Sequence, residues 1–161
     1  MTPPMTPNED VIEQFYRSFQ RGDAAGMIAC YDPAIEFSDP VFGALRGPQV
    51  GAMWQMLTGR AQDFHLTYRD IHADAQGGSA AWEATYVFSQ TGRHVRNRVT
   101  SQFRFQNGKI IRQQDSFDLW KWAGMALGPT GTVLGWFPPL QARIRKNARR
   151  SLDKFMAGRT A

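Results

Sequence analysis

Two adjacent segments of strict two-residue alternation constrain the fold of this chain more than any other feature of its sequence. In residues 80–90, large apolar side chains alternate with polar ones, and in 94–106 apolar or small side chains alternate with arginines and other polar residues. A tight turn joins the two segments, and Asn107-Gly108, a strong hairpin signal, joins the second to 109–117. With a further strand at 64–73, the pattern predicts an antiparallel meander.

The residues before this meander have a helical period. Apolar spacing predicts helices over 9–21, 24–31 and 48–60, with a short strand at 35–38. Asn8 is the predicted N-cap of the first helix. Three helices followed by a four-stranded meander indicate an α+β domain in which helices cover one side of a curved sheet.

The positive charge of the chain is concentrated at its C-terminus. The 161 residues carry a formal charge of +5, yet 138–161 contain seven basic residues and one acidic residue, whereas 1–137 contain 12 basic and 13 acidic residues. The body of the protein is therefore nearly neutral. Because aromatic residues are not interleaved with the basic ones, we expect no nucleic-acid partner.

We expect three parts along the chain: a domain over 8–127, an apolar Gly/Pro loop over 128–139, and a basic amphipathic helix over 140–157. The apolar stripe of this helix could dock on the domain, dock on a second copy, or lie on an anionic membrane surface. Docking is the favoured interpretation, because packing on a protein core is the usual fate of an amphipathic helix.

Several classes of site find no support in the sequence. The single cysteine, Cys30, excludes an intramolecular disulfide and a multi-cysteine metal site, and the three histidines are scattered, so we expect no metal. Motifs for nucleotide binding, phosphoryl transfer, serine hydrolysis and zincin chemistry are missing, so no cofactor is expected. The start of the sequence has no secretory pattern, and no apolar stretch approaches about 18 residues, so we expect a cytoplasmic protein.

Two segments of the sequence resemble the nuclear transport factor 2-like superfamily, which includes ketosteroid isomerase and the SnoaL-like polyketide cyclases. Residues 15–47, FYRSFQRGDAAGMIACYDPAIEFSDPVFGALRG, are similar to the N-terminal half of such domains, and 103–118, FRFQNGKIIRQQDSFD, to their closing strands. The resemblance implies a cone-shaped curved antiparallel sheet, also called a cystatin-like roll, around an apolar pocket. It further implies a homodimer through the outer sheet face, but says little about activity.

The resemblance also suggests catalytic residues. Asp39 matches the general base of ketosteroid isomerase, whereas the two donors that stabilise the enolate oxygen there are replaced by Phe15 and Ser101, so steroid isomerisation is not expected. Asp115 is either a second interior acid or, together with Asp118, an acidic cap of the helix that follows. The cap is the favoured interpretation.

Polar residues on an apolar inner face indicate a lined cavity or, equally, groups that satisfy each other. The expected ligand-binding residues are Tyr31, Trp54, Trp82, Tyr86, Asn97, Ser101, Gln113 and Phe117. We therefore expect a pocket for a small, mostly apolar molecule, with proton transfer, cyclisation or water addition by Asp39 as general base. The alternative is a non-catalytic ligand-binding or dimerisation module of the same fold.

Overall fold

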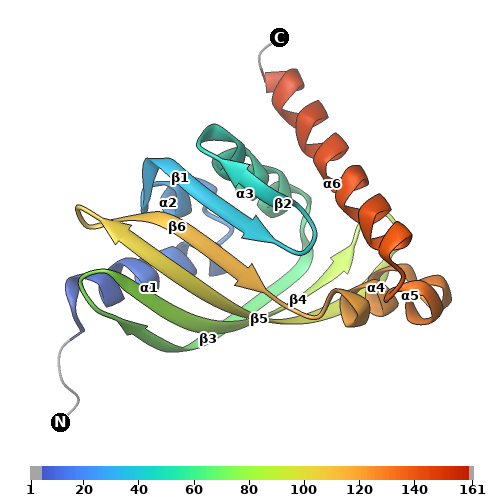
Figure 1. Cartoon of the computed structure of the whole chain (residues 1–161), viewed down its shortest axis with the longest axis horizontal. Helices are drawn as coiled ribbons and strands as arrows, with labels where there is room; N and C mark the ends of the chain where they lie inside the picture. The colour runs from blue at the N-terminus through green and yellow to red at the C-terminus, as the bar shows by residue number, and fades with distance from the viewer. Residues whose placement is uncertain (1–4, 160–161) are drawn as a thin grey trace.

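The computed structural model describes residues 5–159, which form one six-stranded sheet and six helices (Figure 1). In chain order the elements are α1 (Pro7–Gln20), α2 (Ala24–Ile28), β1 (Tyr31–Asp39), β2 (Gly43–Arg46), α3 (Pro48–Arg60), β3 (Gln62–Ala73), β4 (Gly77–Phe88), β5 (Arg93–Gln106), β6 (Lys109–Ser116), α4 (Leu119–Leu127), α5 (Pro129–Leu134) and α6 (Pro138–Arg159). The prediction of an α+β domain with one curved sheet is confirmed.

The strands lie in the order β2-β1-β6-β5-β4-β3. The predicted meander is present as β3 to β6, and its strands pair antiparallel. The expectation of a wholly antiparallel sheet was wrong at one place, because β1 runs parallel to β6. This pairing brings the carboxyl ends of two strands that are far apart in the sequence to the same edge of the sheet.

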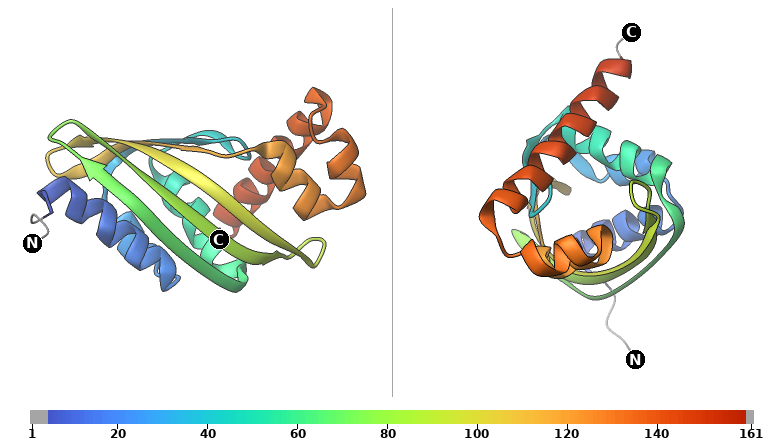
Figure 2. Two further views of the ribbon diagram at one scale, coloured as in Figure 1. Left: turned by 90° about the horizontal axis from the view of Figure 1, so that it is seen from below. Right: turned by 90° about the vertical axis from the view of Figure 1, so that its right-hand side faces the viewer.

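The sheet curves around the N-terminal helices. Figure 2 shows α1 and α3 on the concave side of the sheet, where α1 contacts β3, β4 and β6, and α3 contacts β1 and β2. Between helices and sheet lies an aromatic cluster in which the ring of Phe15 packs against Trp54, and the ring of Phe19 packs against both Trp54 and Trp82. Burying this many large rings is the main favourable contribution to the fold.

The first helix begins earlier than predicted. Thr6, and not Asn8, is its N-cap: the Thr6 hydroxyl accepts a hydrogen bond from the backbone of Glu9, and the Glu9 carboxylate accepts one from the Thr6 backbone. This reciprocal pair is a capping box, which satisfies two free donors at the start of the helix. Asn8 instead donates from its side chain to the carbonyl of Asp74, at a distance of 2.8 Å.

The second helix is shorter than predicted, and the strand after it is longer. The helix ends at Ile28, and Tyr31 begins β1 because it pairs with Ile110 of β6. Helical spacing predicted Tyr31 within the helix, because the pairing partner of this residue lies almost 80 residues away in the sequence. The strand β2, which has four residues and forms a hairpin with β1, was not predicted.

The C-terminal segment is more helical than expected. The predicted loop over 128–139 contains α5 and the start of α6. The stripe of α6 packs on its own domain, where Leu152 is fully buried in the main core and Ile144 in a smaller cluster with α4. Within residues 5–159, no helix combines the length and the apolar character needed to cross a membrane.

Candidate active site

A buried carboxyl group lies at the centre of the polar groups inside the cone. Asp115, near the end of β6, is 4% exposed, and its Oδ1 accepts hydrogen bonds from Ser101 Oγ at 2.6 Å and from Gln113 Nε2 at 3.1 Å. Ser101 is its partner across the β5–β6 ladder. Strand alternation therefore directs Gln113 and Asp115 inward together, and the register places Ser101 beside them.

Ser101 connects Asp115 to the first helix. Its hydroxyl accepts from Tyr16 OH at 2.8 Å and from Trp82 Nε1 at 2.9 Å, so its own proton is directed to Asp115. Tyr16 and Ser101 are both fully buried. Burial, reinforced by the charge of Asp115, raises the pKa of Tyr16 well above its ordinary value, so its hydroxyl stays protonated and remains a donor.

Gln113 connects Asp115 to the other side of the interior. Its Oε1 accepts from Tyr31 OH at 2.6 Å, and Tyr31 OH accepts from Trp54 Nε1 at 2.9 Å. The two branches form one continuous network in which each donor has a buried acceptor. Such a network orients its central group, since each member is costly to move or to leave without a partner.

Asp39 lies at the end of β1. Its Oδ1 accepts from the backbone N–H groups of Val41 at 2.9 Å and Phe42 at 2.6 Å, so the turn predicted for the Asp-Pro sequence is present. Because Ser38 pairs with Gln114 in the parallel ladder, Asp39 is the in-register neighbour of Asp115. Neighbouring strands lie about 4.8 Å apart, so the two carboxyl groups are adjacent.

Both carboxyl groups line the same cavity, which has a volume of about 320 Å³. Its other walls come from the ends of β1 and β6 and the residues just beyond them: Ser38, Pro40, Gln114, Ser116 and Phe117. In both aspartates the hydrogen bonds described above go to Oδ1, and within residues 5–159 no hydrogen bond holds Oδ2. Among these residues, Oδ2 of each carboxyl group is therefore left without a partner next to the cavity.

Burial raises both carboxyl pKa values toward neutrality. Burial raises the pKa of Asp39 from its ordinary 3.8 to about 6, although the backbone donors of the turn act in the opposite direction. Burial raises the pKa of Asp115 to about 7, the hydrogen bonds from Ser101 and Gln113 lower it, and the charge of Asp39 raises it further. At neutral pH the pair can therefore both accept and release a proton.

Five of the eight residues expected to bind a ligand belong to this interior network: Tyr31, Trp54, Trp82, Ser101 and Gln113. Phe117 lines the cavity of the two aspartates. Tyr86 lies toward α4, where its hydroxyl accepts from Trp122 Nε1 at 3.0 Å. Asn97 is half-buried on the inward face of β5, opposite Ala84.

One conclusion about a site residue was wrong. Asp115 does not cap α4, because Asp118 is the N-cap and accepts from the backbone of Lys121, whereas Asp115 lies within β6. The first helix also places a tyrosine hydroxyl in the interior, one residue after Phe15: Tyr16 donates to Ser101. Consecutive side chains of a helix are rotated by about 100° from each other, so Tyr16 and not Phe15 directs a polar group to this network.

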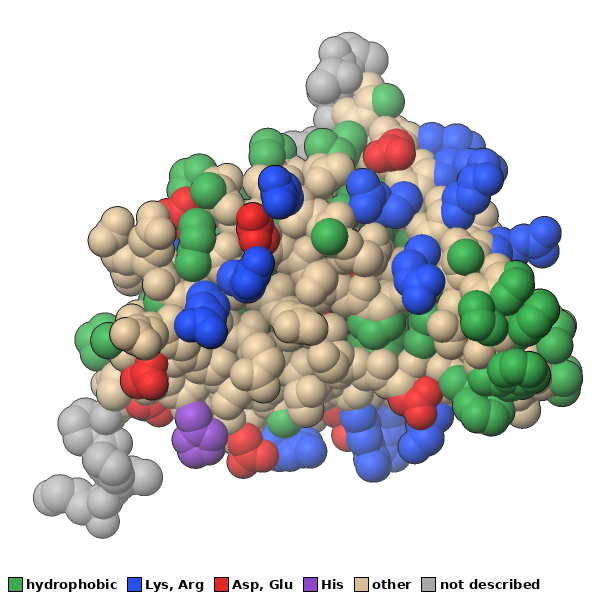
Figure 3. Space-filling model, viewed as in Figure 1, with side chains coloured by type: hydrophobic (Ala, Val, Ile, Leu, Met, Phe, Trp, Pro, Cys, Tyr) green, Lys and Arg blue, Asp and Glu red, His purple; other side chains and the backbone are tan. Residues whose placement is uncertain are grey.

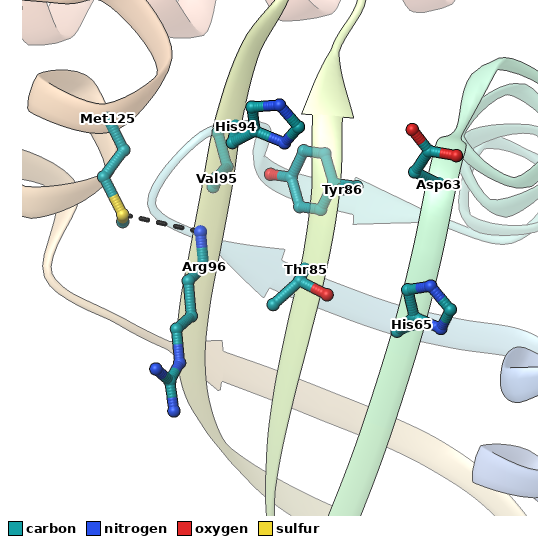
Figure 4. Close-up of a pocket in the computed structure, with 8 residues that line it drawn as sticks. All are labelled: Asp63, His65, Thr85, Tyr86, His94, Val95, Arg96 and Met125. Atoms are coloured by element: carbon teal, nitrogen blue, oxygen red, sulfur yellow. Dashed lines mark hydrogen bonds between the residues drawn. The ribbon is translucent and has the colours of Figure 1, made fainter.

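A second hollow, of about 380 Å³, lies over β3, β4, β5 and α4 (Figure 4). His65, Thr85 and Arg96 occupy paired positions of three adjacent strands, and the backbone N–H of Arg96 donates to Met125 Sδ at 3.4 Å. Alternation puts these side chains on the opposite face of the sheet from Ser101. Arg96 also forms an ion pair with Glu83, in keeping with a solvated outer face.

No group of three or more potential metal-ligating side chains occurs among residues 5–159. The interior polar side chains described above carry carboxyl, hydroxyl, amide and indole groups. Cys30 adds no nucleophile to this set, because burial raises the pKa of its thiol to about 11.

Comparison with solved structures identifies several domains of the same fold. An LEH-like epoxide hydrolase of M. tuberculosis is 20% identical, with a TM-score of 0.65 over 84% of this chain and 99% of that one. AclR, a putative hydroxylase of Streptomyces galilaeus, is 17% identical, with a TM-score of 0.62 over 84% and 100%. An NTF2-like protein of unknown function from Burkholderia pseudomallei is 18% identical, with a TM-score of 0.60 over 71% and 92%.

At these identities the likeness extends to the fold and not to the activity. No curated protein matches the chain. The family model that describes the SnoaL-like domain matches residues 12–113, which include most of the sheet and the helices inside it. This match and the cone-like architecture agree with the resemblance seen in the sequence, and the chain belongs to the SnoaL-like domain family.

Proposed function

We propose that this protein is an acid–base enzyme that binds a small, mostly apolar molecule between the ends of β1 and β6. The observation that carries the proposal is the pair of adjacent carboxyl groups, Asp39 and Asp115, in one cavity with both pKa values raised toward neutrality. Carboxylates in structural ion pairs have lowered pKa values, whereas groups that exchange protons during catalysis have pKa values near the working pH.

The two aspartates have different roles in this proposal. Asp39 has the lower pKa and is mostly ionised at neutral pH, so it is the general base that removes a proton from water or from a carbon acid. Asp115 is protonated in a large fraction of molecules and is the acid that delivers a proton to the oxygen on which negative charge develops. One proton enters the pair and one leaves, and exchange with solvent restores the starting state.

The surrounding residues suit this division of roles. Ser101 and Gln113 donate to Oδ1 of Asp115, which leaves Oδ2 without a hydrogen bond among residues 5–159, and the neutral hydroxyl of Tyr16 donates to Ser101. The ring of Phe117 supplies an apolar wall. A volume of about 320 Å³ is at the small end of ligand pockets, which favours a compact substrate.

Water addition to an epoxide is the first reaction to test. The fold is shared with an LEH-like epoxide hydrolase and a putative hydroxylase, and the acid–base pair could open an epoxide without further groups. Asp39 would take a proton from water as the oxygen attacks an epoxide carbon. Asp115 would then protonate the oxygen released from the ring, and the product would be a diol.

The test uses two substrate panels: small aryl and alkyl epoxides, followed by diol formation, and cyclic ketones in D₂O, followed by deuterium uptake. We expect Asp39→Asn to reduce the rate at least about a hundredfold, the usual contribution of a general base, and Asp115→Asn to reduce it similarly. Asp70→Asn is the matched control, because Asp70 is exposed and has a positive φ that asparagine tolerates.

Unchanged turnover in Asp39→Asn would remove this residue as the base. If wild type binds members of either panel but transforms none of them, the cavity is a non-catalytic ligand-binding site of the same fold.

A further inference from the structure

We infer that one end of this molecule docks on an anionic membrane surface, through exposed apolar side chains on α4, α5 and the turn that leads into α6. We call these side chains the apolar cap; they are Trp120, Val133, Leu134, Trp136 and Phe137. Five of the seven large hydrophobic residues exposed in the described chain belong to it. Figure 3 shows a green patch of hydrophobic side chains at the end of the molecule where α4 and α5 lie. A contiguous patch of this kind marks an interaction site.

The packing of α5 is the reverse of that of an ordinary surface helix. The glycines beside and within α5 face the protein: a Cβ on Gly131 would overlap the carbonyl of Ala123, and one on Gly135 would lie 2.8 Å from the Trp120 ring. Its large side chains face outward, with Val133 65% exposed. An ordinary surface helix packs its large apolar side chains on the core and exposes its polar ones. The exposed apolar side chains of α5 therefore favour contact with an apolar phase over contact with water.

The two indole rings of the cap already have their polar atoms satisfied. Trp120 Nε1 donates to the carbonyl of Thr132 at 2.8 Å, and Trp136 Nε1 donates to the carbonyl of Val133 at 2.8 Å. The rings of Trp136 and Phe137 pack edge to face, with centroids 5.7 Å apart. These rings can therefore enter an apolar phase without leaving a donor unpaired, and little side-chain freedom is lost on binding.

Positive charge continues from the cap along α6. Exposed basic residues of α6 include Arg143, Lys146, Arg150 and Lys154, and no ion pair engages them within residues 5–159. Figure 3 shows Lys and Arg side chains along α6 on the same face as the green patch. In an anionic bilayer, aromatic and apolar side chains can enter the boundary between headgroups and acyl chains. The unpaired basic side chains beside them can then contact the anionic headgroups.

The same charge argues against a second copy as the occupant. Two molecules that joined through their apolar caps would bring two basic α6 helices together, and like charges in contact oppose association. Anionic lipid headgroups neutralise this charge, whereas a second copy doubles it. Charge complementarity therefore selects the membrane surface.

The experiment is sedimentation of the full chain with vesicles of phosphatidylcholine, alone or with about 30% phosphatidylglycerol, a common anionic lipid. We expect binding to the anionic vesicles to be at least about tenfold stronger than to neutral ones, and to fall as NaCl rises from about 0.05 M to about 0.5 M. The double variant Trp136→Ser/Phe137→Ser should lose at least about tenfold in affinity, and Arg143→Gln/Lys146→Gln should lose most of the preference for anionic lipid.

Matched controls separate this surface from general hydrophobicity and charge. Leu57→Ser removes an exposed apolar side chain of α3, and Arg17→Gln/Arg21→Gln removes two exposed charges at α1. Both controls should bind as wild type does. Failure of wild type to bind anionic vesicles, or equal losses in the controls, would overturn the inference. A dimer that Trp136→Ser/Phe137→Ser converts to a monomer, without vesicle binding by wild type, would assign the cap to a second copy instead.

Discussion

At the scale of single residues, Asp115 makes the stability of the fold depend on pH. Its pKa is raised from 3.8 to about 7 in the folded state, so the folded protein holds this proton more tightly than the unfolded chain does. The resulting stabilisation is complete below pH 3.8 and is lost as the pH rises through about 7. One pKa unit corresponds to about 1.4 kcal/mol, so the loss amounts to several kcal/mol.

Asp115→Asn should therefore gain stability relative to wild type as the pH rises. Asparagine keeps the oxygen that accepts from Ser101 and Gln113 but has no charge to bury. Urea unfolding of both proteins between pH 4 and pH 8 measures the difference in free energy of unfolding, which we expect to grow across that range. Parallel curves for the two proteins would show that Asp115 has no raised pKa.

Ser101 should contribute more to stability than Tyr16, because it serves three partners at once. Tyr16→Phe removes one hydroxyl, and Ser101 keeps its other donor in Trp82, so we expect a loss of about 1 kcal/mol. Ser101→Ala leaves the hydroxyl of Tyr16, the indole N–H of Trp82 and the carboxyl of Asp115 without this partner, and should cost about 3 kcal/mol. Equal losses in urea unfolding would contradict the network.

The sequence identified the two carboxyl groups but not how they are used. Gln113 and Asp115 are both buried residues of the last strand, yet two acids before a helix are also typical of a cap, so the sequence left the role of Asp115 open. Only the register between β5 and β6 shows that Ser101 faces Asp115. Tyr16 was missed because the rotation of a helix about its own axis depends on tertiary packing, which counting residues along the sequence does not measure.

At the scale of elements, the contact between α4 and α5 depends on the absence of a side chain at Gly131. A methyl group there would overlap the carbonyl of Ala123, so Gly131→Ala should force the two helices apart and lower the melting temperature by several degrees. Gly59→Ala is the control: nothing lies within 4 Å of a Cβ there, and alanine in α3 should be neutral or stabilising by up to about 1 kcal/mol. Calorimetry of both variants measures the contrast, and equal melting temperatures would contradict it.

The elements that the sequence predicted well are those whose signal is local. The long strands and α3 have continuous periodicity, and the tight turn at Asn107-Gly108 fixes one hairpin. β2 and the first residues of β1 depend on partners from other parts of the chain. The helix α5 has three glycines and a proline in or beside it, a composition that local propensity assigns to a loop.

At the scale of the whole molecule, the apolar side of α6 packs into the core, whereas its basic side is exposed. Leu152→Ala should cost about 2–5 kcal/mol, because this side chain is fully buried in the main core. The basic residues of α6 make trypsin a direct probe, and we expect Leu152→Ala to speed tryptic cleavage within this helix. Lys146→Ala changes an exposed residue of the same helix and is the control. We expect it to leave the rate of tryptic cleavage at the remaining sites unchanged. If Lys146→Ala speeds cleavage as much as Leu152→Ala does, the stability of α6 does not depend on the buried contact of Leu152.

The parallel pairing of β1 with β6 also has a consequence for how the protein is made. Asp39 leaves the ribosome many residues before Asp115, and β1 has only its short hairpin with β2 until β6 has been synthesised. Contacts of such large sequence separation form slowly, because closing the long intervening loop is unfavourable. The two carboxyl groups therefore meet only after nearly the whole domain has been translated, so a nascent chain cannot carry the acid pair before its sheet is complete.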